Sequence, residues 1–375
     1  MALRVGIDFS PLTHGNMERG IGVYATNLLE ALTEADNTTE YILLANRDIR
    51  NFECFENLPV NFRLHELPYP RLGRATFLYT HQFLLGSEVK RLKLDVLHCL
   101  SVPMNPSHAQ IPWRQTVPTI VTVYDLIPLH MKEQFLREFR HRLFYRFMLN
   151  CCRRAAHLLA ISNSTRDDFI REGIASPDQI SVIPLGTPKF PAPQQIDLPQ
   201  LPGSYILHIG GADPQKNQQA VLTAFALLCQ DHSFKHDLVL VGSHHLPTQL
   251  AIETRVHRLS HLSRANLRSV LEKASLLLFP SLQEGFGLPI LEAMSCGVPV
   301  IVSNIPAIQE TAGDAALLVD PTNCVQLAQA ANQILRNRTN RQQLQQLGKS
   351  RVQQFDWRHT AEQTMTIYKQ FGRKK

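Results

Sequence analysis

The stretch "ASLLLFPSLQEGFGLPILEAMSCGVPVIVS" (residues 274–303) contains a complete strand–loop–helix–strand pattern. Apolar runs at 274–281 and 298–303 flank a helical segment that begins near Pro289 and ends before Gly297. Proline suits the first turn of a helix, and glycine suits the position just past its end. The flanking runs of Val, Ile, Leu and Phe predict parallel strands that are buried on both faces.

The same pattern repeats along the whole chain. Short apolar runs occur at 3–9, 40–46, 95–101, 119–125, 157–162 and 180–186, and again at 205–211, 237–243, 274–281, 298–303 and 315–320. Amphipathic stretches separate them, and this alternation is typical of an α/β fold with parallel sheets. The sequence therefore predicts two doubly wound, Rossmann-like sheets.

The length of the chain and one proline-rich segment predict two domains. A chain of 375 residues is too long for one ordinary core. We predict an N-terminal domain at 1–188, a linker at 189–203, a C-terminal domain at 204–356, and a helix at 357–375 that packs back toward the N-terminal domain. Ligands of such sheets bind at the carboxyl ends of the strands, so a shared site would lie in a cleft between the domains.

Composition narrows the class of protein. Hydrophobic residues make up 44% and charged residues 19%, which is typical of a globular chain. Seven scattered cysteines without metal-ligand spacing favour reduced thiols, and the N-terminus reads directly as a strand, so we expect a cytoplasmic protein. The net charge of +6 suits phosphate ligands or an anionic membrane but is too small to indicate nucleic-acid binding.

Two glutamates in the opening stretch are candidates for ligand binding. Glu284 follows the strand in a glycine-rich loop, and Glu292 lies about one turn into the helix. A carboxylate at Glu292 can accept both hydroxyls of a ribose, and Glu284 can accept those of a second sugar. The alternative is structural: Glu292 would offset the helix dipole, and Glu284 would be a solvated loop residue.

The segment "FPSLQEGFGLPILEAMSCGVPVIVSNIPAIQETAGDAALLVDP" (279–321) resembles the signature region of glycosyltransferase family 4. Segments 5–32, 156–169, 180–186 and 205–225 resemble other parts of that family in the expected order. The resemblance implies the GT-B fold, with two Rossmann-like domains facing across a cleft. It also implies a retaining, metal-independent enzyme whose substrate is a nucleotide-diphosphate sugar and which needs no cofactor.

The resemblance assigns roles to the opening stretch. Glu292 is expected to bind the nucleotide ribose, and Glu284 the transferred sugar. The residues between them that are expected to contact the donor are Gly285, Phe286, Gly287 and Leu288.

The segment "GGADPQKN" (210–217) predicts a phosphate site. Gly210 and Gly211 make a tight turn after a strand, and Lys216 precedes a helix whose N–H groups face an anion. A fixed cation there would stabilise the charge that develops on a leaving diphosphate. Family members often have an arginine at the place of Gly211, so Lys216 either works alone or is helped by another cation, such as Arg19.

The opening turn supplies further candidates. Gly20 and Gly22 precede an amphipathic helix, with Arg19 beside them, but the dinucleotide-binding spacing is absent. The glycines indicate either close helix packing or, by the resemblance, a donor contact. Arg19 is a candidate on the acceptor side.

Three residues of the first half are further candidates: Tyr124 and Asp125 as catalytic residues, and Ser162 on the acceptor side. Tyr124 and Asp125 end an apolar run where the family often has His-Asp. A phenol titrates near pH 10 and is a poor base at neutral pH, and Asp125 could instead order the loop. Ser162 resembles an acceptor-side serine of the family, or it caps the following helix.

The segment "HRLSHLSRANLRSVLEKA" (257–274) reads as strand, turn and helix. The resemblance places the nucleotide base near His261 and Leu262, held by backbone contacts. None of the sixteen histidines shows ligand spacing with a carboxylate, so no metal site is predicted.

The stretch "REFRHRLFYRFMLNCCRRAAHLL" (137–159) is rich in basic and aromatic residues. Its arginines after Arg137 are Arg140, Arg142, Arg146, Arg153 and Arg154, and its aromatic residues are Phe139, Phe144, Tyr145 and Phe147. It is either a packed helix with a solvated basic face or a helix through which a peripheral protein contacts the inner face of an anionic membrane.

The expected function is transfer of a hexose from a nucleotide sugar to an acceptor hydroxyl on a glycan or lipid-linked molecule. Mannose from GDP-mannose is preferred because "GIDFSPL", "RGIG" and "DLIPL" resemble mannosyltransferase-like members, and polysaccharide or glycolipid assembly is the natural setting. The alternatives are a degenerate nucleotide-sugar-binding protein without turnover and a sugar-nucleotide epimerase of the same fold. A glycosidase fits less well, because its two carboxylates act as acid and nucleophile.

Overall fold

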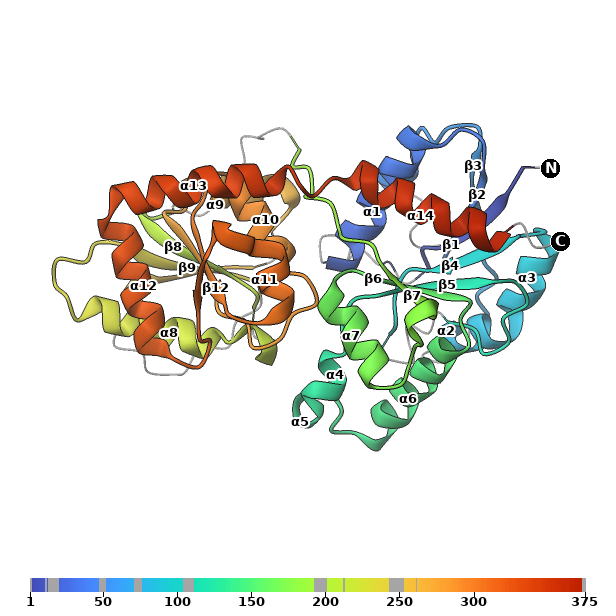
Figure 1. The fold of residues 1–375 in the computed structure, drawn as a ribbon, viewed down its shortest axis with the longest axis horizontal. Helices are drawn as coiled ribbons and strands as arrows, with labels where there is room; N and C mark the ends of the chain where they lie inside the picture. The colour runs from blue at the N-terminus through green and yellow to red at the C-terminus, as the bar shows by residue number, and fades with distance from the viewer. Residues whose placement is uncertain are drawn as a thin grey trace. The chain divides into compact units, whose positions relative to one another are not determined.

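The computed structural model describes residues 2–10, 12, 20–46, 52–70, 76–103, 111–191, 201–211, 213–242, 253–260 and 262–372. The chain divides into two compact units, Met1–Gly186 with Asp356–Lys375 and Thr187–Phe355 (Figure 1). Phe190 and Pro191, within the stretch expected to be a linker, contact Arg264 and Arg268 of the second unit.

The first unit is built on a parallel sheet with the strand order β3-β2-β1-β4-β5-β6-β7 among its described residues. The strands are β1 (Arg4–Asp8), β2 (Glu40–Ala45), β3 (Phe62–Glu66), β4 (Val96–Cys99), β5 (Thr119–Val123), β6 (His157–Ala160) and β7 (Ile180–Val182). Strands β1, β4, β5 and β6 are apolar and almost fully buried, as their sequences predict. The strand order reverses between β1 and β4.

Helices of the first unit follow or precede these strands. They are α1 (Gly20–Ala35), α2 (Thr76–Tyr79), the π-helix η4 (Thr80–Leu84), α3 (Leu85–Arg91), α4 (Ile127–His130), α5 (Lys132–Phe135), α6 (Phe139–Arg153), α7 (Asn163–Arg171) and α14 (Trp357–Gly372), with short 3-10 turns at Glu53–Phe55 and Pro177–Gln179. The C-terminal helix α14 belongs to this unit and packs against α1. Its Tyr368 hydroxyl lies 2.6 Å from Nδ1 of the buried His98 on β4.

The second unit is built on a parallel sheet with the order β10-β9-β8-β11-β12-β13 among its described residues. The strands are β8 (Tyr205–Ile209), β9 (Asp237–Val241), β10 (Val256–Leu259), β11 (Leu276–Phe279), β12 (Val300–Ser303) and β13 (Leu317–Val319). The helices are α8 (Gln218–Cys229), α9 (Arg264–Lys273), α10 (Leu288–Ser295), α11 (Pro306–Ala312), α12 (Cys324–Arg336) and α13 (Arg338–Val352), with 3-10 turns at Pro214–Lys216, Glu253–Arg255 and Gly313–Ala315.

The order of the second sheet reverses between β8 and β11. These two strands pair directly, with Leu276 opposite Ile206 and Leu277 opposite Leu207. The segments that follow Ile209 and Phe279 therefore leave the same edge of the sheet side by side. In doubly wound folds this reversal point at the carboxyl ends of the strands is where ligands bind.

Candidate active site

The loop after β8 places a lysine over a glycine turn. Gly210 N donates to Val241 O at 3.2 Å, which keeps the turn close to β9. A Cβ atom on Gly210 would lie only 2.8 Å from Cβ and Cγ of Lys216, so the lysine side chain lies directly against this glycine. The absence of a side chain at 210 thus lets Lys216 fold back over the end of the strand.

The loop after β11 brings a carboxylate to this lysine. Leu282 N donates to Gln215 O at 2.7 Å, which ties the two loops together. Glu284 Oε1 accepts from Lys216 Nζ at 2.5 Å and from Ser281 Oγ at 2.8 Å. The lysine and glutamate side chains are 18% and 9% exposed, so water screens their attraction only partly. The structure therefore brings the predicted residues Lys216 and Glu284 into direct contact at the reversal point of the sheet.

The glycine-rich loop continues into α10. Gly287 is the N-cap of this helix and has a φ of 95°, a left-handed conformation that favours glycine. A Cβ atom there would also lie 2.8 Å from Ile308 Cδ1. Phe286 is buried and packs edge-on against Phe355, and its carbonyl accepts from Thr311 Oγ1 at 2.6 Å. Gly285 is buried and Leu288 is half-buried.

Glu292 lies on α10 and is only 4% exposed. A carboxylate this deep needs a compensating charge or hydrogen bonds. Arg264, the first residue of α9, supplies them by donating from Nη1 to Glu292 Oε1. The guanidinium also lies over the ring of Phe190, at 4.4 Å from its centroid. The sequence analysis did not identify Arg264, because nothing in the spacing of α9 and α10 shows that these two side chains meet.

Among the first-unit candidates, Tyr124 and Ser162 are engaged in internal hydrogen bonds. The Tyr124 hydroxyl donates to Leu100 O at 2.9 Å, and burial raises the pKa of this phenol well above its usual value. Ser162 is buried and caps α7, since its Oγ accepts from Thr165 N at 3.0 Å. Thr165 in turn donates to Tyr124 O at 2.8 Å, which ties α7 to the end of β5.

The remaining candidates are placed as follows. Asp125 Oδ1 accepts from Ile127 N at 2.9 Å and so orders the turn after β5. Gly20 is the exposed first residue of α1, and Gly22 is buried in it. Leu262 is half-buried between β10 and α9. Arg19 and His261 lie outside the described residues.

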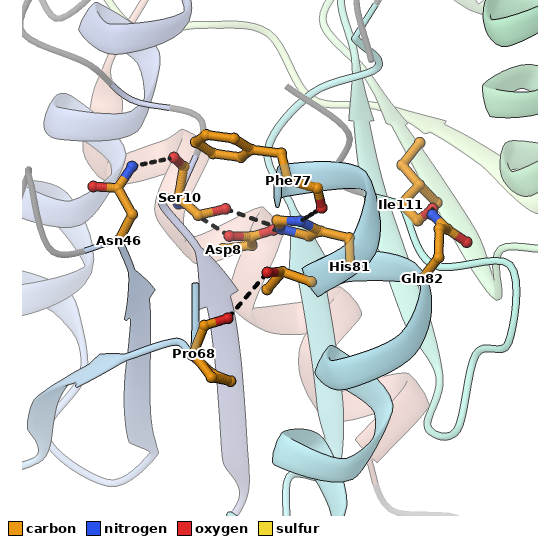
Figure 2. Close-up of polar contacts among 9 residues, drawn as sticks. Asp8, Ser10, Asn46, Pro68, Phe77, His81, Gln82 and Ile111 are labelled. Atoms are coloured by element: carbon orange, nitrogen blue, oxygen red, sulfur yellow. Dashed lines mark hydrogen bonds and ion pairs between the residues drawn. The ribbon is translucent and has the colours of Figure 1, made fainter. Parts of the chain in front are cut away.

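A buried polar cluster at the carboxyl end of β1 was not predicted. His81 Nε2 lies 2.9 Å from Asp8 Oδ2 and 3.0 Å from Ser10 Oγ, and its Nδ1 lies 2.8 Å from Phe77 O (Figure 2). Both ring nitrogens thus face oxygen atoms within hydrogen-bonding distance. His81 lies in the π-helix η4, a local irregularity that is frequent at functional sites. Asp8 and His81 are fully buried, and their contact holds η4 against β1.

The described part of the chain shows neither a metal-binding cluster nor a membrane-spanning helix. No cluster of three or more His, Cys, Asp or Glu side chains there could hold a metal ion. None of the described helices combines the length and the apolar character that crossing a bilayer requires.

Solved structures with the same architecture define the class of protein. Sucrose-phosphate synthase from Thermosynechococcus elongatus superposes with a TM-score of 0.72 at 20% identity, covering 98% of both chains. WaaG, a glycosyltransferase involved in lipopolysaccharide biosynthesis, superposes with a TM-score of 0.71 at 16% identity, covering 97% of this chain and 99% of its own. The two parallel α/β units therefore have the GT-B fold, as predicted.

Family models then specify the group. Residues 19–188 match Glycosyltransferase Family 4, and residues 195–351 match Glycosyl transferases group 1. The two matches together span most of the chain. The chain therefore belongs to the glycosyltransferases that combine a Glycosyltransferase Family 4 domain with a Glycosyl transferases group 1 domain. The family resemblance inferred from the sequence is confirmed.

Several relatives that are named mannosyltransferases match the chain over part of their length. O-antigen chain mannosyltransferase B from Escherichia coli is 34% identical over 173 residues, which is 44% of this chain and 45% of the relative. MMP alpha-(1->4)-mannosyltransferase from Mycolicibacterium hassiacum is 30% identical over 236 residues, 60% of this chain and 56% of the relative. The chain thus spans about half the length of these relatives.

Proposed function

We propose that this chain is a retaining hexosyltransferase that moves mannose from GDP-mannose to an acceptor hydroxyl, without a metal or other cofactor, in polysaccharide or glycolipid assembly. The observation that carries the proposal is the meeting of Lys216 and Glu284 at the reversal point of the second sheet. Glu292 lies on the helix that follows the same loop. The mannosyltransferase names of relatives support mannose as the sugar.

The proposed chemistry uses one cation and two carboxylates. The bond between the anomeric carbon and the diphosphate oxygen breaks with its electron pair on oxygen, and the anomeric carbon bonds to the acceptor oxygen. Lys216 stabilises the charge on the leaving diphosphate, which is a preorganised electrostatic role. Glu284 accepts hydroxyls of the sugar, and Glu292 accepts those of the ribose.

The acceptor proton passes to the leaving phosphate oxygen in this proposal. The Tyr124 hydroxyl is already donated to Leu100 O, and burial raises the pKa of the phenol, so it is a poor base. Asp125 holds the adjacent turn through Ile127 N. The reaction therefore needs no protein side chain as general base.

Nucleotide release from a panel of GDP-, UDP-, ADP- and dTDP-sugars, in the presence of EDTA, tests the proposal. We expect slow release of GDP from GDP-mannose, because such enzymes hydrolyse their donor slowly, and loss of this activity in Glu292→Ala. Strict dependence on a divalent metal would contradict the mechanism.

The same assay separates the two alternative functions. Tight donor binding that Glu292→Ala abolishes, with no release even when lipid-linked and glycan acceptors are supplied, would identify a binding protein without turnover. Conversion of the donor to its epimer without release of nucleotide would identify an epimerase.

We further propose that the enzyme works in the cytoplasm and contacts an anionic membrane through α6. One face of this helix is buried through Phe144, Tyr145 and Met148. The other exposes Phe139 and Leu143, which are 73% and 59% exposed. The exposed arginines on or just after α6 are Arg140, Arg142, Arg146, Arg153 and Arg154. Apolar side chains among cations suit the interface of an anionic bilayer.

Vesicle sedimentation tests this contact. We expect binding to phosphatidylcholine vesicles that contain phosphatidylglycerol, weaker binding in high salt, and loss of binding in Phe139→Ser with Leu143→Ser. Equal binding by the double variant and the wild type would contradict the proposed contact.

A further inference from the structure

The ion pair between Arg264 and Glu292 leaves part of each side chain without a partner. Among the described residues, Arg264 donates to Glu292 through Nη1, and Glu292 accepts through Oε1. Within the described residues, Arg264 Nη2 is shielded from solvent and makes no hydrogen bond, and Glu292 Oε2 accepts none. A shielded donor without a partner is unfavourable, so a further hydrogen-bonding group would complete this arrangement.

A hydroxyl oxygen, whether of water or of a ligand, fits both remaining atoms. It donates one hydrogen bond and accepts others, so it can satisfy a carboxylate oxygen and a guanidinium nitrogen together. Amide, ammonium and carboxylate groups do not combine both roles in one atom. The cis-diol of a ribose supplies two such hydroxyls.

We propose that Arg264 is a positioning residue for the donor ribose, an inference that rests on the proposed function. Its Nη1 fixes Glu292 Oε1 and keeps the buried carboxylate turned so that Oε2 accepts from a ribose hydroxyl. Its Nη2 donates to the same diol. The guanidinium stacks on the ring of Phe190, and this contact restricts the rotamers of Arg264 and so keeps its two Nη atoms in place.

The position of Arg264 explains how it acts without contacting the reacting atoms. It begins α9, and Ser263 caps that helix by accepting from Asn266 N at 3.3 Å. Lys216 and Glu284, by contrast, lie on the loops after β8 and β11. Arg264 should therefore affect recognition of the nucleotide, with little effect on the rate once donor is bound.

Calorimetric titration with paired nucleotides tests the proposal. The probes are GDP and UDP, each beside its 2′,3′-dideoxy analogue, with the full chain. We consider whichever of GDP and UDP binds more tightly. For that nucleotide, we expect the wild type to bind the ribonucleotide with a Kd about 100-fold lower than that of its dideoxy analogue, because two charge-assisted hydrogen bonds are lost in the analogue. Arg264→Gln should lower that preference about tenfold, and Arg264→Lys should lower it less.

Three comparison variants make the result specific. Arg268→Gln removes an arginine one turn further along α9, which pairs with Glu272 at 2.7 Å, and should keep the full preference. Glu292→Gln should reduce the preference, and adding Arg264→Gln to it should reduce the preference further, but by less than Arg264→Gln does alone. The double variant also removes both charges of the pair, so it serves as the folded control if Arg264→Gln is unstable.

The outcomes separate this inference from the function on which it rests. Equal losses for the ribonucleotide and its analogue in Arg264→Gln, or no loss, would overturn the role of Arg264. If Glu292→Gln alone reduced the preference, ribose recognition would stand without Arg264. If the wild type showed no preference, or bound neither nucleotide, the proposed function itself would fail.

Discussion

Replacement of Lys216 by methionine removes the proposed leaving-group cation while keeping a similar apolar stem. That stem matters because Lys216 packs against Gly210 and its ammonium lies 5.0 Å from the centroid of the Phe279 ring. Loss of one preorganised electrostatic contact to a developing charge typically lowers kcat by 10²–10³-fold, or about 3–4 kcal/mol. We expect a fall of this size in transfer from GDP-mannose, with a much smaller change in the affinity for the intact donor, whose diphosphate has not yet gained this charge.

The same substitution affects stability, and the two effects can be separated. Glu284 would keep its bond from Ser281 but lose its cation, and because the pair is partly exposed the cost should be about 1–2 kcal/mol. Lys216→Met with Glu284→Gln should recover most of this stability without recovering the rate. Lys235→Met, at an exposed lysine of the same unit, is the charge control. A kcat for Lys216→Met within threefold of the wild type would refute the reasoning.

Two further substitutions test the fold around the site and the anchoring of α14. Gly287→Ala should lower the free energy of unfolding, measured in urea, by roughly 2–3 kcal/mol. The left-handed backbone and the 2.8 Å distance from an added Cβ to Ile308 Cδ1 both oppose a side chain at this position. Gly203→Ala is the control and should be nearly neutral, because no heavy atom lies within 4 Å of its added Cβ. Burial lowers the pKa of His98 from 6.5 to about 3, so the unfolded chain binds a proton that the folded chain does not, and stability present above pH 6.5 is lost toward pH 3. Between pH 6.5 and 4.5 this histidine should contribute about 2–3 kcal/mol of that loss. In urea titrations, the free energy of unfolding of His98→Gln should therefore depend less steeply on pH than that of the wild type. An identical pH dependence for variant and wild type would show that His98 does not cause the loss.

The sheets were predictable from the sequence because their strands are buried. Each apolar run identified in the sequence contains one strand of the structure, since a parallel strand covered on both faces must be apolar throughout. Strand β3 was missed for the converse reason. It lies at the edge of the first sheet, and three of its five residues, Arg63, His65 and Glu66, are polar, so no apolar run marks it.

The candidate site was predictable only where its residues are close in sequence to a strand end. Lys216 and Glu284 each follow an apolar run within a few residues, and pairing of β8 with β11 brings them together. Arg264 meets Glu292 through the packing of α9 on α10, and His81 meets Asp8 through a π-helix. Side-chain contacts across 28 and 73 positions leave no periodic signal in the sequence.

A crystal structure of the chain with GDP would show whether Lys216 and Glu292 bind the donor nucleotide. We expect ribose hydroxyls within hydrogen-bonding distance of Glu292 and the terminal phosphate within hydrogen-bonding distance of Lys216 Nζ. A nucleotide whose ribose lies away from Glu292, or whose diphosphate lies away from Lys216, would contradict this expectation.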